Sequence, residues 1–249
     1  NEVEFLNQNR RRIEKDVVNE ALKQIENDRF TNIVYGEGWN QGVLGIVASR
    51  IIERSYKPTI VMTESNEHIL TGSVRSVKDY DVYQSLSDCE DNILQYGGHK
   101  YAAGLKIKKT NFDIFKNQFE DIVKDSVGQK MFKRSFSYDL LIDFSELTIE
   151  NVKIIRRMAP FGLGNKRPVF RTNNCFIDSK LRFLGKEEQV VKSKIKDKNG
   201  SQLPFICFDK KSELVDLKSS FDILYNVNLN SFSGQDMIEL TLREVFIKK

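Results

Sequence analysis

The chain is organised around one stretch, Gly97-Gly98-His99-Lys100-Tyr101-Ala102-Ala103-Gly104. Its three glycines and two alanines leave the backbone without bulk, so a ligand can approach it closely. Consecutive amides and His99 could then donate to an anion, and phosphate is the anion that this pattern favours. The alternative is a tight turn that opens a strand, with His99 on the surface. The spacing alone leaves both interpretations open.

A second glycine-rich loop precedes this stretch, at residues 36–42. It follows a β-rich run at 31–35 and leads into helical periodicity over 43–52. This order places backbone amides at a helix N-terminus, where the helix dipole favours anions. The spacing matches neither the P-loop nor the dinucleotide fingerprint. A tight strand-to-helix turn is an equally good interpretation.

A third candidate site lies at the end of a predicted strand, in the run Gly72-Ser73-Val74-Arg75-Ser76. Ser73 and Arg75 are two residues apart, so in an extended strand their side chains share one face. A hydroxyl and a guanidinium side by side make a good receptor for phosphate. A surface salt bridge of Arg75 is the alternative.

The first half of the chain alternates helices and strands. After a helix over 6–25, periodicity predicts a strand, a helix, two strands, a helix, a strand and a helix, at 31–35, 43–52, 59–62, 68–75, 82–94, 105–107 and 112–122. This order predicts an α/β domain of about a hundred residues, followed by a polar linker at 125–134.

The second half consists of short strands. They are predicted at 136–142, 168–170, 175–177, 181–184, 190–195, 203–208, 221–229 and 238–246, with one helix at 149–158 and turns at 198–200 and 233–234. This pattern predicts a small antiparallel barrel. Lys192, Lys194 and Lys196 alternate along one strand and would share a face, as a nucleic-acid contact or as a solvated surface.

Composition narrows the class of protein. The chain has 249 residues, 40% apolar and 30% charged, which is ordinary for a folded protein of one or two domains. No apolar run approaches the roughly 18 residues that span a bilayer, and the first residues do not resemble a signal sequence, so we expect a cytoplasmic protein without a membrane contact. Three scattered cysteines, Cys89, Cys175 and Cys207, predict reduced core thiols, and two histidines exclude a histidine-rich metal site.

Charge is distributed unevenly along the chain. Residues 1–125 carry 17 Lys and Arg against 20 Asp and Glu, and residues 126–249 carry 22 against 15. The second half, with a net charge of +7, is therefore the better candidate for binding a polyanion.

Five stretches together resemble the bacterial RecJ family of single-strand-specific DNA exonucleases, in the DHH phosphoesterase superfamily. They are residues 6–11, 38–48, 72–76, 97–104 and 159–170, the last similar to the family's Pro-Phe-Gly-Gly-Asn signature. The resemblance implies a connecting helix at 1–28, a mixed-sheet DHH-associated α/β domain at 29–127 and an all-β OB-fold barrel at 128–249. It also implies that the DHH half, which would hold Mn²⁺ or Mg²⁺, is absent, because no Asp-His-His sequence occurs here. We therefore expect this chain to bind no metal and not to hydrolyse DNA by itself.

The resemblance also implies roles for single residues. Gly72, Ser73 and Arg75 match the family's pocket for the 5′ phosphate. Gly97, Gly98 and His99 match the strip that faces the metals and the scissile phosphate, with His99 in a catalytic role, and Gln41 with Gly42 matches the loop beside them. Two departures are Asn40, where the family usually has histidine, and the lack of a His-Leu-Lys segment near 190–192.

The predicted function is the substrate-binding part of a 5′ to 3′ single-stranded-DNA exonuclease in DNA repair and recombination. The expected partner is single-stranded DNA, and the resemblance adds helicases and single-strand-binding protein. Two alternatives stay open, a stand-alone nucleic-acid-binding module and part of a phosphoesterase for short oligonucleotides or cyclic dinucleotides.

Overall fold

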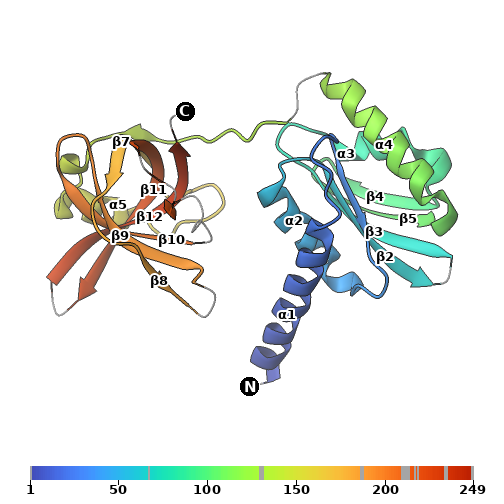
Figure 1. Ribbon diagram of the computed structural model, residues 1–249, viewed down its shortest axis with the longest axis horizontal. Helices are drawn as coiled ribbons and strands as arrows, with labels where there is room; N and C mark the ends of the chain where they lie inside the picture. Colours follow the sequence, from blue (N-terminus) through green and yellow to red (C-terminus); the bar gives the residue numbers. More distant parts are fainter. Residues whose placement is uncertain are drawn as a thin grey trace. The chain divides into compact units, whose positions relative to one another are not determined.

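The chain forms two compact units, Asn1–Arg134 and Ser135–Lys249, each with its own apolar core (Figure 1). The computed structural model describes residues 2–66, 68–128, 132–185, 188–208, 214–215, 217, 219–232 and 235–247. None of the helices in these ranges has the length and apolar character that crossing a bilayer requires.

The first unit is a sheet of order β1-β2-β3-β5-β4 with helices on both faces (Figure 1). Its strands are β1 (Asn32–Tyr35), β2 (Thr59–Asn66), β3 (Ile69–Arg75), β4 (Gln95–His99) and β5 (Ala102–Lys108). Its helices are α1 (Glu2–Leu22), α2 (Leu44–Arg54), α3 (Val82–Ser87) and α4 (Phe112–Val127), with 3-10 turns at Gln41–Val43, Glu90–Asn92 and Lys109–Asn111. Only β1 and β2 pair in parallel among these strands.

The two faces of this sheet are covered unequally. One face carries Ile60 and Met62 and packs against α3 and α4. The other carries Val34 and Val61 and packs against α1 and α2. Because α2 lies over β2 and β3, the part of that face over β5 and β4 stays open to solvent, and its residues are exposed apart from the half-buried Ala102.

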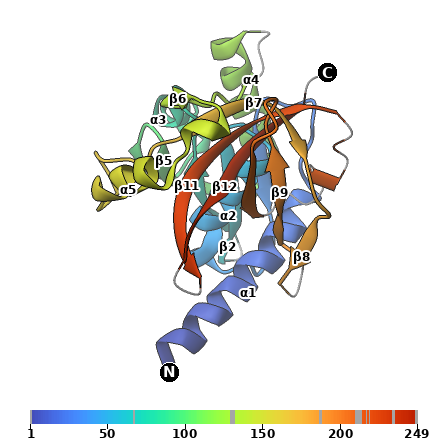
Figure 2. The same cartoon turned by 90° about the vertical axis from the view of Figure 1, so that its left-hand side faces the viewer.

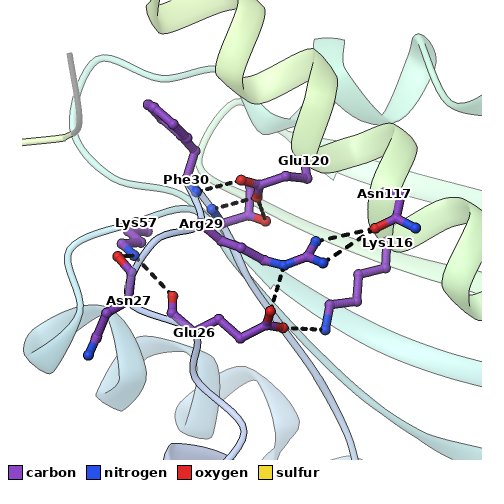
Figure 3. Close-up of polar contacts among 9 residues, drawn as sticks. Glu26, Asn27, Arg29, Phe30, Lys57, Lys116, Asn117 and Glu120 are labelled. Carbon is purple, nitrogen blue, oxygen red and sulfur yellow. Dashed lines mark hydrogen bonds and ion pairs between the residues drawn. The ribbon is translucent and has the colours of Figure 1, made fainter. Parts of the chain in front are cut away.

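A network of polar contacts fixes the segment between α1 and β1 to α4 (Figure 3). The buried carboxylate of Glu120 accepts hydrogen bonds from the backbone amides of Phe30 and Thr31, at 2.6 and 3.0 Å. Nearby, Lys116 of the same helix pairs with Glu26 at 2.7 Å. Since buried acceptors need partners, Glu120 sets the position where β1 begins.

The second unit is a barrel of strands β6 (Leu140–Leu141), β7 (Phe170–Ile177), β8 (Arg182–Leu184), β9 (Val190–Lys196), β10 (Gln202–Phe208), β11 (Phe221–Phe232) and β12 (Gln235–Ile247). It also contains α5 (Ile149–Arg157) and a 3-10 turn at Phe144–Glu146. Five strands close a ring, β7-β11-β12-β10-β9, through the pairing of β9 with β7. The predicted small antiparallel barrel is present, but one pair of the ring departs from the prediction, because β10 and β12 run parallel. A closed ring with an odd number of strands must contain such a pair.

Four other local predictions differ from the structure. The helix predicted at 82–94 ends at Ser87 and gives way to a 3-10 turn, and the glycine-rich run at 95–99 is itself a strand, β4. The strands predicted at 168–170 and 175–177 are one strand, β7, and the strand predicted at 136–142 is reduced to β6. The predicted turn at 233–234 lies outside the described residues.

Other predictions are confirmed. All three cysteines are free and buried, as expected for core thiols. Burial raises the pKa of the Cys89 and Cys175 thiols to about 12, so neither is a reactive thiolate near neutral pH.

Candidate nucleic-acid interface

The open half of the first sheet brings the predicted residues into two parallel rows. Strand register places Ser73 beside Gly104 and Gly97, and the next row runs from Arg75 through Ala102 to His99. Residues directly opposite in a sheet project from the same face. Arg75 and His99 therefore stand two strands, about 10 Å, apart on a surface of glycine and alanine.

Arg75 is the cationic group at one side of this surface, and it is half-buried. Its Nη1 donates to Ser73 Oγ at 3.1 Å and to the carbonyl of Val74 at 2.8 Å. These bonds fold the guanidinium back toward α2, where a Cβ placed on Gly45 would lie only 2.6 Å from Nη2. No carboxylate among the described residues pairs with Arg75, so its charge is available to an anion.

The N-terminus of α2 adds partial positive charge at the same place. Gln41 and Gly42 are exposed in the 3-10 turn that leads into α2, and Asn40 Oδ1 accepts from the Gly42 amide at 2.8 Å. Asn40, a departure from the family pattern, thus caps this turn. Trp39 holds the loop in place. Its ring packs against Gly36, and its indole N–H donates to Glu20 of α1 at 2.8 Å. The amides of Gly42, Val43 and Leu44 already have acceptors within this turn, so the positive charge that favours an anion here comes from the helix dipole.

Two of the predicted residues lie on the opposite face of the sheet. Gly72 pairs with Met62 and Leu105, and a Cβ there would lie 2.9 Å from Met62 Cγ. Gly98 has a φ of +150°, and a Cβ there would lie 2.4 Å from the carbonyl oxygen of Ala102. Both glycines therefore allow close packing within the sheet. Gly97 differs, because nothing lies within 4 Å of its Cβ position and it leaves the backbone of the open face uncovered.

A shallow hollow of about 330 Å³ continues the open face along the strands. Beside Gly97 and Gly104 it is lined by Thr71, Gln95 and Lys106. Sequence reasoning missed Gln95 because β4 was not predicted as a strand, whereas Lys106 lay in the strand predicted at 105–107 and was not assigned to the site. The alternation of Lys106 with buried Leu105 and Ile107 was a signal that could have placed it on this face.

Gly45→Ala tests whether the position of Arg75 matters. We expect folding stability to be kept or raised by up to about 1 kcal/mol, because alanine is the better helix former. The new methyl would displace the guanidinium, so binding of a 5′-phosphorylated oligonucleotide should weaken about five- to tenfold. Fluorescence anisotropy measures this, with Ser49→Ala on the exposed side of α2 as the control. Equal affinities of the two variants would contradict the expectation.

The barrel unit presents a second cationic face, on β9 and β10. Lys192, Lys194 and Lys196 point away from the core, because Val191, Ser193 and Ile195 between them are buried. Lys192 pairs with Glu239 and Lys196 with Asp178, each at 3.4 Å, whereas exposed Lys194 has no ionic partner among the described residues.

Neighbouring strands complete this face. Exposed Arg182 on β8 pairs in register with Lys192, and Phe208 on β10, 51% exposed, pairs with Val190. Strands 2 and 3 of an OB-fold barrel are the face that binds oligonucleotides, and β9 and β10 hold these places in the ring. No pattern in the sequence indicated that Phe208 would be exposed.

Two family models match the chain in succession, the DHHA1 domain over residues 14–125 and the RecJ OB domain over residues 138–244. Single-stranded-DNA-specific exonuclease RecJ of Bacillus subtilis is 27% identical over 254 residues, covering 100% of this chain and 32% of that protein. The RecJ of Haemophilus influenzae is 30% identical, covering 96% of this chain and 44% of that protein. The chain thus spans less than half the length of these relatives.

A crystal structure of RecJ from Thermus thermophilus in complex with Mn²⁺ has the same fold. It superposes with a TM-score of 0.82 at 22% identity, over 100% of this chain and 36% of that one. The predicted order of an α/β domain followed by an OB-fold barrel, with an N-terminal helix, is confirmed. The chain belongs to the RecJ family and comprises its DHHA1 and OB domains.

Proposed function

We propose that this chain is the substrate-holding part of a single-strand-specific DNA exonuclease that degrades from the 5′ end, in DNA repair and recombination. The observation that carries the proposal is the bare face of Gly97, Ala102 and Gly104, bordered by Arg75 beside a helix N-terminus. A backbone without side chains lets a DNA strand lie close to the sheet. The family to which the chain belongs supports DNA as the ligand.

Arg75 and Ser73 would bind the terminal 5′ phosphate. A guanidinium forms charge-assisted hydrogen bonds with phosphate, and the N-terminus of α2 adds its dipole. Because a terminal phosphate carries more charge than an internal phosphodiester, this pocket would select the strand end and fix its direction. The exposed 3-10 turn with Gln41 and Gly42 would flank the same phosphate.

His99 would contact the phosphodiester under attack. It is exposed at the end of β4, two strands from Arg75, so it would face a phosphate beyond the terminal one. A hydrogen bond from its imidazole would stabilise the negative charge that builds up on that phosphate. Gly97 keeps the approach to this imidazole free of side chains.

The metal ions of the reaction would bind outside the described residues of this chain. The Thermus proteins were crystallised with Mn²⁺ and with Mg²⁺. The described ranges of our structure contain no group of three or more His, Cys, Asp or Glu side chains placed to hold a metal ion. We therefore propose that residues 1–249 alone bind single-stranded DNA without cleaving it, and that the ions act in a DHH domain of the whole enzyme.

The barrel would hold the strand beyond the pocket, through Lys192, Lys194 and Lys196 and through stacking on Phe208. Stacking of a base on an aromatic ring contributes about 1 to 3 kcal/mol and tolerates any sequence. Helicases and single-strand-binding protein remain predicted partners. Three buried free thiols are compatible with action in the reducing cytoplasm.

The salt dependence of binding tests the proposed function. We expect residues 1–249 to bind an oligothymidylate in a way that weakens as salt rises, because phosphate contacts release counterions. Lys194→Gln should reduce the slope of log K against log salt by about 0.7, the value for one contact to a single strand. Lys124→Gln, an exposed lysine of α4, is the control and should leave the slope unchanged. Absence of binding at low salt would refute the proposal.

A further inference from the structure

A second hollow, of about 230 Å³, lies in the barrel unit between α5, the loop 159–168 and the end of β11. Figure 2 shows α5 beside β11. Its walls combine apolar side chains, such as Ile155, Phe161 and Leu229, with the polar ends of Arg156, Arg167 and Asn230. The proposed contacts of the β9–β10 face do not include these residues.

The loop that forms one wall is held in place by its own contacts. Asn165 Nδ2 donates to the carbonyls of Met158 and Pro160, at 2.8 and 2.9 Å. The Arg167 guanidinium lies over the Phe161 ring, 5.3 Å from its centroid, and donates to Asn228 Oδ1 at 2.6 Å. Phe161 is therefore fixed in position before any ligand arrives.

The charge around the hollow favours a polyanion. Residues 149–168 contain five Lys and Arg and a single acidic residue, Glu150. Lys153 is paired with Asp236, but Arg156 is exposed and has no ionic partner among the described residues. An apolar wall with an unpaired arginine at its edge suits a ligand that is flat and apolar on one side and anionic on the other.

The hollow also adjoins the lysine face of the barrel. Asn230, which lines it, donates to Glu239 at 2.7 Å, and Glu239 pairs in turn with Lys192 of β9. The negative charge of the Glu239 carboxylate repels a phosphate that lies between the hollow and the lysine face. A strand that passes here would therefore turn its phosphates outward and a base inward.

We propose that one nucleobase of the bound single strand enters this hollow and stacks against Phe161, while the adjoining phosphate pairs with Arg156. The volume suits a single ring system, since pockets for larger organic ligands begin at about 300 Å³. Asn230 offers hydrogen-bonding groups to the edge of the base. The inference rests on the proposed function, because it needs the chain to bind single-stranded DNA.

The test uses residues 1–249 and an oligonucleotide that carries 5-iodouracil. Phe161→Leu removes the ring and should weaken binding about 5- to 100-fold, the range for one stacked base. Arg156→Gln should weaken it about fivefold, whereas Arg157→Gln, the next residue on α5 and no part of the hollow, should change it less than twofold. Phe161→Tyr keeps an aromatic ring and should bind with the affinity of the wild type. Irradiation of the wild-type complex should cross-link the iodouracil to the peptide that contains Phe161.

The outcomes separate this inference from the proposed function. Wild-type affinity of Phe161→Leu and Arg156→Gln, with a weakened Lys194→Gln, would overturn the base pocket and leave the proposed function standing. Failure of the wild-type chain to bind would overturn both. If Arg156→Gln loses binding of an acidic peptide probe but keeps full affinity for the oligonucleotide, the hollow belongs to a protein partner and the base pocket is overturned too. If Phe161→Leu does not fold, the comparison of Arg156→Gln with Arg157→Gln decides.

Discussion

Arg75→Ala is expected to weaken binding of a 5′-phosphorylated single strand about 10- to 100-fold, and to leave a 5′-hydroxyl strand within about twofold. Hydrogen bonds to a charged group contribute about 1.5 to 3 kcal/mol. Among the described residues no carboxylate pairs with Arg75 and neutralises its charge. The measurement is fluorescence anisotropy with two oligonucleotides that differ only in the terminal phosphate.

Two controls make this result specific to the guanidinium. Arg75→Lys keeps the charge but loses the planar pair of donors, so it should fall between wild type and Arg75→Ala. Arg54→Ala removes an exposed arginine at the far end of α2 and should change neither affinity. Equal losses for both oligonucleotides would show that Arg75 is a general cationic contact and not a receptor for the strand end.

The barrel shows what periodicity could predict. Strand β9 has buried residues at every second position with lysines between them, so its alternation was visible in the sequence. Strand β4 was missed because Gly97 and Gly98 contribute no side chains to an alternating pattern. The parallel pairing of β10 with β12 could not be predicted from local patterns, because it follows from the closure of the whole ring.

The types of residue in the candidate site could be predicted from the sequence, whereas the faces to which their side chains point could be predicted only in part. Ser73 and Arg75 share a face, as their spacing required, and register brings Gly97 and His99 onto it. Gly72 faces the core on the other side of the sheet because of the same alternation. Treating residues 72–76 as a single motif hid this. Gly45 escaped prediction because its role is to leave room for a side chain that is distant in the sequence.

Gly97→Ala and Gly98→Ala are expected to have opposite effects. Gly98→Ala should lower the free energy of unfolding of the first unit by about 2 to 6 kcal/mol, because alanine at a φ of +150° is strained and its methyl would lie 2.4 Å from the Ala102 carbonyl oxygen. Gly97→Ala should change stability by less than about 1 kcal/mol, since its methyl meets nothing within 4 Å. Urea unfolding followed by the fluorescence of Trp39, the single tryptophan, reports on this unit alone.

Binding then separates the two interpretations of the glycine stretch. If the open face carries the DNA strand, the methyl of Gly97→Ala would stand between the strand and the sheet, and affinity should fall about tenfold at unchanged stability. If the glycines serve only the hairpin between β4 and β5, Gly97→Ala should bind as wild type does, and Gly98→Ala should lose binding only in proportion to the unfolded fraction. A stable Gly97→Ala variant with full affinity would therefore show that DNA does not bind on this face and that the stretch is only a turn, because the methyl would lie on the path proposed for the phosphates.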